Sequence, residues 1–202
     1  MIKTIIFDFG DVFINLDKTA TIRELSTLGD IRSLQEMQEI NNLYEVGKIS
    51  TSEFITLFQE LFPKATKTQI INAWNSILLD FPKHRLEFIQ NLASEQNYKL
   101  ILLSNTNELH INWVKENITF YKQFKSCFDT FYLSHEIHLR KPTPDIFEFV
   151  LQEHKIQPSE TIFIDDTKEN TDAAATLGIH TWNNNPKTED ITNLFTIKSD
   201  LF

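Results

Sequence analysis

The chain has 202 residues, of which 41% are hydrophobic and 23% charged, as is ordinary for a soluble globular protein with one sizeable core. Its net charge of -9 argues against nucleic acid or an anionic membrane as the main partner, but not against a small anionic substrate. A single cysteine, Cys127, excludes an internal disulfide, and no stretch approaches the roughly 18 apolar residues of a membrane span, so we expect a cytoplasmic protein.

The first predicted element is a strand, "TIIF" at residues 4–7. A run that is continuously apolar rather than alternating is typical of a strand buried on both faces of a parallel sheet. Asp8 follows it directly, and Asp11 comes three residues later, with Gly10 between them. Because open parallel sheets bind ligands beyond the carboxyl ends of their strands, Asp8 is a candidate functional residue.

Residues 17–80 contain no convincing strand and read as amphipathic helices. Ser50 and Glu53 have the spacing of a capping box, and apolar residues with helical spacing follow at Phe54 and Phe58. We expect four helices here, packed as a small bundle that interrupts an α/β domain.

The rest of the chain alternates buried strands with helices, which predicts a doubly wound parallel α/β sheet. The expected core is 1–16 with 81–202, and the expected helical cap is 17–80. Further strands are predicted at 99–104, 130–134, 161–165 and 179–182, and helices at 85–96, 108–117, 144–154 and 168–177.

Polar residues follow the later strands as Asp8 follows the first. They are Ser104 and Asn105, then Lys141 in a longer loop, then Asp165 and Asp166. Asp8 and Asp166 are of the type that shares a hard cation such as Mg²⁺, whereas a hydroxyl and an amine suit phosphate oxygens. Each residue alone is explained by a structural role in a turn or a helix cap. Their order after successive strands is what indicates a functional site.

Four motifs carry a resemblance to a known family. The chain resembles the haloacid dehalogenase-like hydrolase superfamily in "IIFDFGDV", "LILLSNTN", "RKPTPDIF" and "TIFIDDTKEN", and in its helical insert between the first two. "YEVGKIS" and "AAATLG" are similar to the branch containing small sugar-phosphate phosphatases. The resemblance implies a Mg²⁺-dependent phosphatase of small phosphorylated metabolites that uses an aspartyl-phosphate intermediate.

The resemblance also implies a role for each matching position. Asp8 matches the nucleophile, and Asp8, the Gly10 carbonyl and Asp166 match the metal ligands. Asp165 matches an indirect or water-mediated ligand. Ser104 and Lys141 match the hydroxyl and the lysine that bind phosphate. Asn105 should support that site.

Gly10 departs from the pattern of most phosphatases of this superfamily, which carry a second Asp there as general acid and base. The metal should not be affected, because the ligand at this position is a backbone carbonyl. Proton transfer should be weaker, since general acid–base catalysis is typically worth roughly 10²–10⁴-fold. The weakness would matter least for good leaving groups such as an anomeric hydroxyl. Gly10 also allows a positive φ, and Asp11 is either a substitute acid or a loop-capping residue.

Other readings stay open. A 2-haloacid dehalogenase would also use Asp8 but no metal, a phosphoryl-transferring mutase would want the missing Asp, and a non-catalytic relative would fit Gly10. His135 and His138 have H-x-x-H spacing, for which exposed loop histidines are a better reading than a zinc site.

Overall fold

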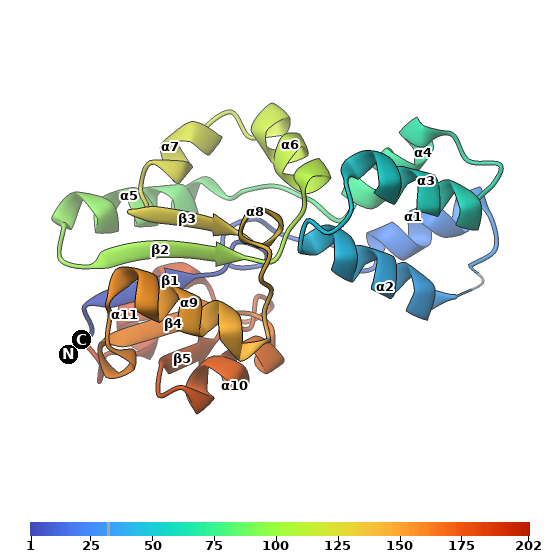
Figure 1. Ribbon diagram of the computed structural model, residues 1–202. Helices are drawn as coiled ribbons and strands as arrows, with labels where there is room; N and C mark the ends of the chain where they lie inside the picture. The colour runs from blue at the N-terminus through green and yellow to red at the C-terminus, as the bar shows by residue number, and fades with distance from the viewer. Residues whose placement is uncertain (32) are drawn as a thin grey trace.

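The computed structural model describes residues 1–31 and 33–202. Five parallel strands form one sheet in the order β3-β2-β1-β4-β5, with β1 at its centre (Figure 1). This order confirms the predicted doubly wound α/β fold. The strands are β1 Thr4–Phe7, β2 Lys99–Ser104, β3 Thr130–Leu133, β4 Thr161–Asp165 and β5 His180–Asn183.

Helices cover both faces of the sheet, which is why its strands are apolar at successive positions. Ile5 and Phe7 point into a core with α5, α6 and α7, whereas Ile6 points to the opposite face with α9 and α10. The helices are α5 Lys83–Glu95, α6 Glu108–Asn117, α7 Tyr121–Lys125, α9 Pro144–His154 and α10 Lys168–Thr176. Gly178 follows α10 with φ 82°, the left-handed conformation that glycine commonly adopts just after a helix.

Short elements complete the sheet domain. They are the helices α8 Ser134–Ile137 and α11 Leu194–Ile197 and the 3₁₀ turns η1 Pro158–Glu160 and η2 Ile191–Asn193. Many of the 17 phenylalanines gather under α5 and α7; the rings of Phe13 and Phe124, for example, lie 4.9 Å apart. Within the described residues, no helix has both the length and the apolar character needed to cross a membrane.

A helical insert follows β1 and lies beside the carboxyl ends of the strands (Figure 1). It consists of the four predicted helices, α1 Ala20–Leu28, α2 Leu34–Glu45, α3 Thr51–Leu61 and α4 Lys67–Asn75. The capping box of Ser50 and Glu53 is present at the start of α3. Phe54, Phe58 and Trp74 belong to a separate hydrophobic core inside the insert.

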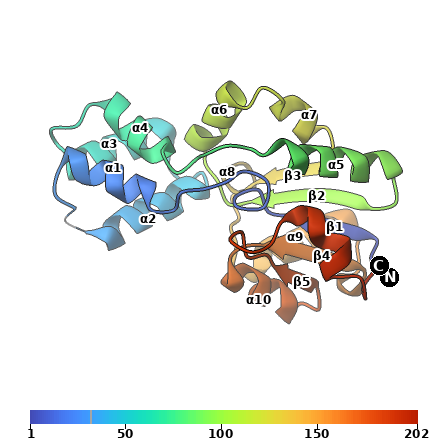
Figure 2. The same ribbon diagram turned by 180° about the vertical axis from the view of Figure 1, so that it is seen from behind.

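Two segments connect the insert with the sheet, and they run side by side (Figures 1 and 2). The amide of Asn15 donates to the carbonyl of Asp80 at 2.9 Å, and the amide of Leu79 donates to the carbonyl of Asn15 at 3.0 Å. Asp17 and Ile77 make a further backbone bond at 2.9 Å. Because the two crossings are tied to each other, the insert is joined to the sheet by one narrow paired connection.

Candidate active site

A buried lysine between two carboxylates forms the centre of the site. Lys141 Nζ donates to Asp8 Oδ1 at 2.7 Å and to Asp165 Oδ2 at 2.6 Å, and only 1% of Lys141 is exposed. Asp8 directly follows β1 and Asp165 ends the neighbouring β4, so the parallel pairing of these strands sets the two carboxylates side by side. A charge this deeply buried is tolerated because it is paired and hydrogen-bonded.

Asn105, directly after β2, holds Lys141 in place. Its Nδ2 donates to the Lys141 carbonyl at 2.8 Å, and its Oδ1 accepts from the Lys141 amide at 2.9 Å. The amide side chain thus pairs with the backbone of Lys141 as a neighbouring strand would. Asn105 therefore positions the lysine, and it also lines the cleft beside it.

Asp165 is fully buried, and both of its carboxylate oxygens are engaged. Besides Lys141, it accepts hydrogen bonds from the amide of Thr167 at 2.8 Å and from Asn170 Nδ2 at 3.0 and 3.1 Å. Sequence analysis did not single out Asn170. It lies five residues after Asp165 on the first turns of α10, and only the turn between strand and helix brings the two together.

Asp166 faces a lysine from the connection to the insert, Lys18, which sequence analysis also missed. Lys18 Nζ contacts Asp166 Oδ2 and lies 3.2 Å from Asp11 Oδ2. The two acids are nearly buried, whereas the Lys18 side chain is about half exposed. No local pattern marks Lys18, because its partner Asp166 is 148 residues away in the chain.

The three acids form a set of oxygen donors suited to a hard cation. One carboxylate oxygen from each of Asp8, Asp165 and Asp166 lies within 4.8 Å of the other two. Burial raises the pKa of Asp8 to about 7, against the lowering effect of Lys141, and Asp165 and Asp166 raise it further. Burial also raises the pKa of Asp166. Crowded acids with raised pKa values favour a bound divalent cation, so these residues fit Mg²⁺.

A side chain at Gly10 would meet the end of the Leu16 side chain. A Cβ at Gly10 would come within 2.8 Å of Leu16 Cδ1. Gly10 does not use the positive φ that glycine allows; Gly47 and Gly178 are the glycines that have one. The left-handed residue of this loop is Asp11, with φ 53°.

Asp11 is bonded within its own loop, which favours the loop-capping reading. Its Oδ1 accepts from the amide of Leu16 at 2.9 Å, and its own amide donates to the carbonyl of Ile14 at 2.7 Å. Its other carboxylate oxygen faces Lys18. The side chain therefore closes the turn after β1.

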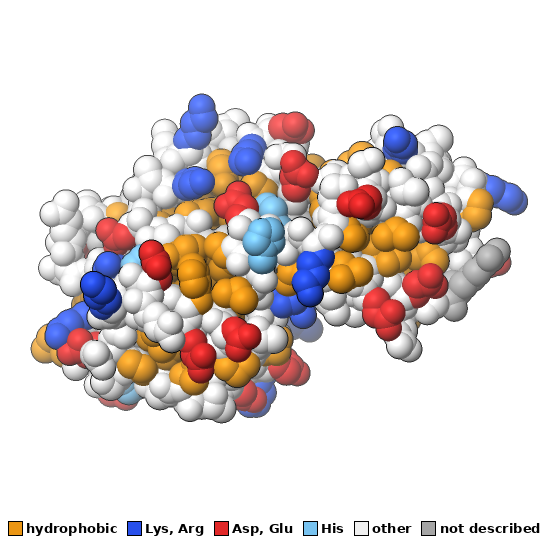
Figure 3. Space-filling model, viewed as in Figure 1, with side chains coloured by type: hydrophobic (Ala, Val, Ile, Leu, Met, Phe, Trp, Pro, Cys, Tyr) orange, Lys and Arg blue, Asp and Glu red, His pale blue; other side chains and the backbone are white. Residues whose placement is uncertain are grey.

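The site opens into a cleft of about 690 Å³ between the strand ends and the insert. Its walls include Asp8, Lys141 and Asp166 from the sheet and Lys18 and Gln38 from the connection and the insert. Figure 3 shows Lys and Arg side chains at this junction. Ser104, at the end of β2, is 3% exposed and lines an adjoining cavity of about 180 Å³ together with Gly10 and Asn105.

Comparisons with known proteins agree with this geometry. A family model described as haloacid dehalogenase-like hydrolase matches residues 2–178. The chain belongs to the haloacid dehalogenase-like hydrolases. The prediction of this family, with an α/β core and a helical insert after β1, is therefore confirmed.

Two relatives of this hydrolase come from Bacteroides thetaiotaomicron. A D-ribitol-5-phosphate phosphatase is 30% identical, over 90% of this chain and 91% of its own. A family enzyme solved in complex with magnesium and inorganic phosphate is 36% identical, with a TM-score of 0.85, over 96% of this chain and 100% of that one.

Two more distant structures bear on the fold. A predicted family hydrolase from Porphyromonas gingivalis is 30% identical, with a TM-score of 0.76, over 90% of each chain. A 2-haloacid dehalogenase from Pseudomonas syringae is 15% identical, with a TM-score of 0.63, over 100% of each chain. At that identity the dehalogenase shows the shared fold alone.

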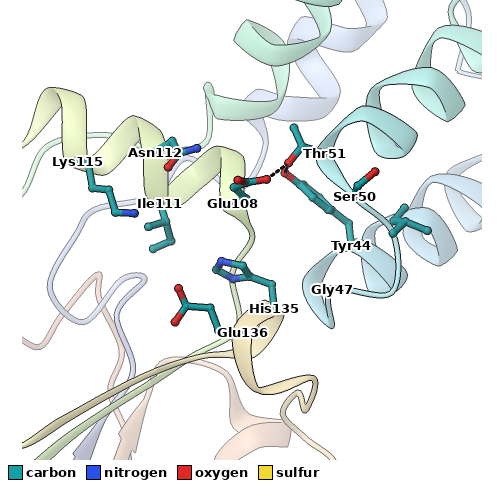
Figure 4. A pocket seen from close by; sticks show the side chains of 11 residues that line it. Tyr44, Gly47, Ser50, Thr51, Glu108, Ile111, Asn112, Lys115, His135 and Glu136 are labelled. Carbon is teal, nitrogen blue, oxygen red and sulfur yellow. Dashed lines mark hydrogen bonds between the residues drawn. The ribbon is translucent and has the colours of Figure 1, made fainter.

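A second hollow of the hydrolase, about 350 Å³, lies at another part of the junction and contains none of the predicted site residues (Figure 4). There Thr51 bonds to Glu108, and Tyr44 Oη bonds to Thr51 at 2.8 Å and accepts from the Leu109 amide at 3.1 Å. These bonds join the insert to α6. His135 lines this hollow, and His138 bonds to the carbonyl of Val46 at 2.9 Å. Among the described residues, neither histidine belongs to a cluster that could hold a metal.

His110 is a buried imidazole at the junction of the insert and α6. It stacks on Trp74, and its Nε2 bonds to the Trp74 carbonyl at 3.2 Å while Nδ1 bonds to Asn107 at 3.2 Å. Burial lowers the pKa of His110 to about 4, so the unfolded chain binds more protons than the folded one between about pH 4 and pH 6.5. We expect the contribution of His110 to stability to be complete above pH 6.5 and to be lost as the pH falls toward 4. Denaturation of wild type and His110→Gln across this range should show a shallower pH dependence in the variant; equal slopes would contradict the assignment.

Proposed function

We propose that this hydrolase is a Mg²⁺-dependent phosphatase of small phosphorylated metabolites, and that Asp8 carries the phosphoryl group during turnover. The observation behind the proposal is one arrangement: a buried Asp8 that shares Lys141 with Asp165, beside Asp166, at the edge of a 690 Å³ cleft. A phosphatase and a magnesium–phosphate complex among relatives at 30% and 36% identity support it.

The reaction has two displacements at phosphorus. Lys141 holds Asp8 Oδ1, so the other oxygen, Oδ2, attacks; the phosphorus–oxygen bond to the leaving alcohol breaks, and that oxygen takes up a proton. Water then attacks the phosphorus of the aspartyl-phosphate, the bond to Asp8 breaks, and inorganic phosphate leaves; the proton that this water gives up balances the one taken up by the leaving alcohol. Mg²⁺, held by Asp8, Asp166 and the Gly10 carbonyl with Asp165 as an indirect ligand, would neutralise the charge of the phosphoryl oxygens.

The phosphate is bound from the side of β2 and the Lys141 loop. The ammonium of Lys141 has three N–H donors and uses two on Asp8 and Asp165, which leaves one for a phosphate oxygen. The hydroxyl of Ser104 has only a weak contact, 3.5 Å to the Asn105 carbonyl, and is available as a second donor. Asn105 contributes indirectly, through the position of Lys141.

The substrate we propose is a sugar or polyol phosphate. D-ribitol 5-phosphate, the substrate for which one relative is named, carries its phosphate on a primary alcohol. The proposal is therefore not restricted to the anomeric phosphates that the missing acid at Gly10 favours. The residues 17–80 would act as a cap, hinged at the paired connection, that excludes water from the cleft. The chain has one cysteine, which fits our proposal of a reducing cytoplasm.

A dehalogenase is the second candidate, and the acidic cluster disfavours it. A dehalogenase needs Asp8 as nucleophile but no metal, whereas here Asp165 and Asp166 complete a set of cation ligands. A non-catalytic relative would likewise have no need of the buried Lys141, of Asp165 or of Asp166.

Metal dependence tests the proposal. Purified protein should release phosphate from a panel of sugar and polyol phosphates in the presence of Mg²⁺. EDTA should lower the rate of phosphate release by at least about 10²-fold, because the phosphate would then face carboxylates whose charge is not compensated. Adding excess Mg²⁺ back should restore the rate. Full activity in EDTA, or halide release from 2-chloropropionate without phosphate release, would replace this function with the alternative.

A further inference from the structure

The end of α2 is a part of the insert that meets the loop between β3 and α9. Residues 44–47, which begin the "YEVGKIS" motif, make this contact. His138 Nδ1 bonds to the Val46 carbonyl at 2.9 Å. Gly47 has a φ of 63°, and a Cβ there would collide with the carbonyl oxygen of His135 (Figure 4). The two backbones therefore approach closely at a position that favours glycine.

An ion pair joins this part of the insert to the residue that precedes Lys141. Arg140 donates from Nη2 to Glu45 Oε2 at 2.8 Å and from Nε to the same oxygen at 3.1 Å. Asn41 Nδ2 donates to the other oxygen, Glu45 Oε1, at 3.3 Å. Only 28% of the Arg140 side chain and 15% of the Glu45 side chain are exposed. Because partly buried ion pairs are screened less than exposed ones, this pair holds the insert against the loop.

The sheet holds the same loop from the other side. Asn105 bonds to both backbone groups of Lys141, and the Lys141 ammonium lies between two carboxylates of the sheet. The backbone at Arg140 and Lys141 thus lies between one set of bonds from the sheet and one from the insert. Movement of the insert about its paired connection would have to break the pair of Arg140 with Glu45 or move the backbone that carries Lys141.

We propose that Glu45 and Arg140 are positioning residues, and that their ion pair couples the closing of the insert to the binding of phosphate by Lys141. Glu45 acts on Arg140, and Arg140 acts through the backbone of Lys141. The effect is on the phosphate, which is common to all phosphate esters, and not on the leaving group. This inference rests on the proposed phosphatase function and adds a control of the same site by the position of the insert.

Glu45→Gln tests the coupling, because the amide keeps the shape of the side chain and removes its charge. We expect KM to rise about tenfold for sugar phosphates and for an aryl phosphate alike, since a hydrogen bond to a charged group is worth roughly that factor. The change in kcat should be less than about threefold, because the reacting groups are untouched. Glu39→Gln, the same substitution at an exposed position of α2, is the matched control and should leave both constants unchanged.

Arg140 also lines the catalytic cleft, so a double-mutant cycle separates its indirect role from a direct contact with phosphate. If Arg140 acts together with Glu45, then Arg140→Gln and the double variant Arg140→Gln/Glu45→Gln should have the KM of Glu45→Gln to within about twofold. Increases in KM that add up in the double variant would mean that the two residues act separately, and would overturn the inference. A KM of Glu45→Gln equal to that of wild type would overturn it as well.

Hydrogen exchange separates this inference from the function on which it rests. The Leu109 amide donates to Tyr44 Oη across the junction at 3.1 Å, so its protection reports the contact of the insert with α6. Mg²⁺ with inorganic phosphate should slow this exchange in wild type. In Glu45→Gln, but not in Glu39→Gln, the exchange should be faster and the slowing by phosphate smaller.

Two outcomes of the exchange measurement are decisive. The same exchange at Leu109 in wild type and Glu45→Gln, with and without phosphate, would overturn the coupling. A wild type in which phosphate slows the exchange, and in which Glu45→Gln weakens that effect, supports the coupling even if no phosphate ester is ever hydrolysed. In that case the phosphatase function would fail and the coupling would stand.

Discussion

Asp8→Asn is expected to lower the rate of phosphate release by about 10⁴-fold or more, because a carboxamide of the same shape is a far poorer nucleophile than a carboxylate. Folding should be preserved, since the amide oxygen can still accept the 2.7 Å hydrogen bond from Lys141. Single-turnover and steady-state phosphate release with magnesium would measure the loss.

The control for Asp8→Asn is Asp11→Asn in the same loop. An asparagine at position 11 can still accept from the Leu16 amide and tolerates a φ of 53°, so we expect a change of less than about tenfold. Two results would count against the assignments. Activity of Asp8→Asn within tenfold of wild type would remove Asp8 as the nucleophile. A large and selective loss in Asp11→Asn on poor leaving groups would make Asp11 the missing acid.

Lys141→Met is expected to lower the free energy of unfolding by about 3–5 kcal/mol at neutral pH, in addition to removing activity. The substitution leaves Asp165, which is fully buried, without its cation, and it does the same for Asp8. Urea denaturation followed by tryptophan fluorescence would measure the loss.

Lys168→Met is the matched control for this effect. Lys168 pairs with Asp172 four residues later on α10, but both side chains are more than 60% exposed, so we expect a change of no more than about 0.5 kcal/mol. The double variant Lys141→Met/Asp165→Asn should recover part of the stability, because it removes one of the stranded charges. Equal stability of Lys141→Met and wild type would mean that the ion pairs of Lys141 with Asp8 and Asp165 do not contribute to the stability of the fold.

Leu16 lies beside the position of the missing acid at Gly10. Leu16 fills the space that a side chain at Gly10 would enter, while the backbone carbonyl remains at that position. Leu16 bridges to Leu78 in the paired connection and also lines the cleft, so a carboxylate at position 10 would require its terminal methyl to move. We therefore expect the leaving group to take its proton from water or from a residue other than Gly10.

The local pattern of the sequence was enough to predict most of the fold. Continuous apolar runs predicted buried parallel strands, and the capping box at Ser50 predicted the start of a helix, because both depend on residues close in the chain. The strand ends then placed Asp8 and Asp165 at one edge of the sheet. The order of acid, hydroxyl, amide, lysine and paired acids after successive strands made the family recognisable.

Only the tertiary structure decided how those residues are used. The contacts of Lys141 with Asp8 and Asp165, and of Lys18 with Asp166, span 24 to 148 residues, and no local spacing encodes them. Local propensity thus determines the elements and the chemistry they carry, whereas the pairing of buried charges and the shape of the pocket depend on which distant surfaces exclude water from one another.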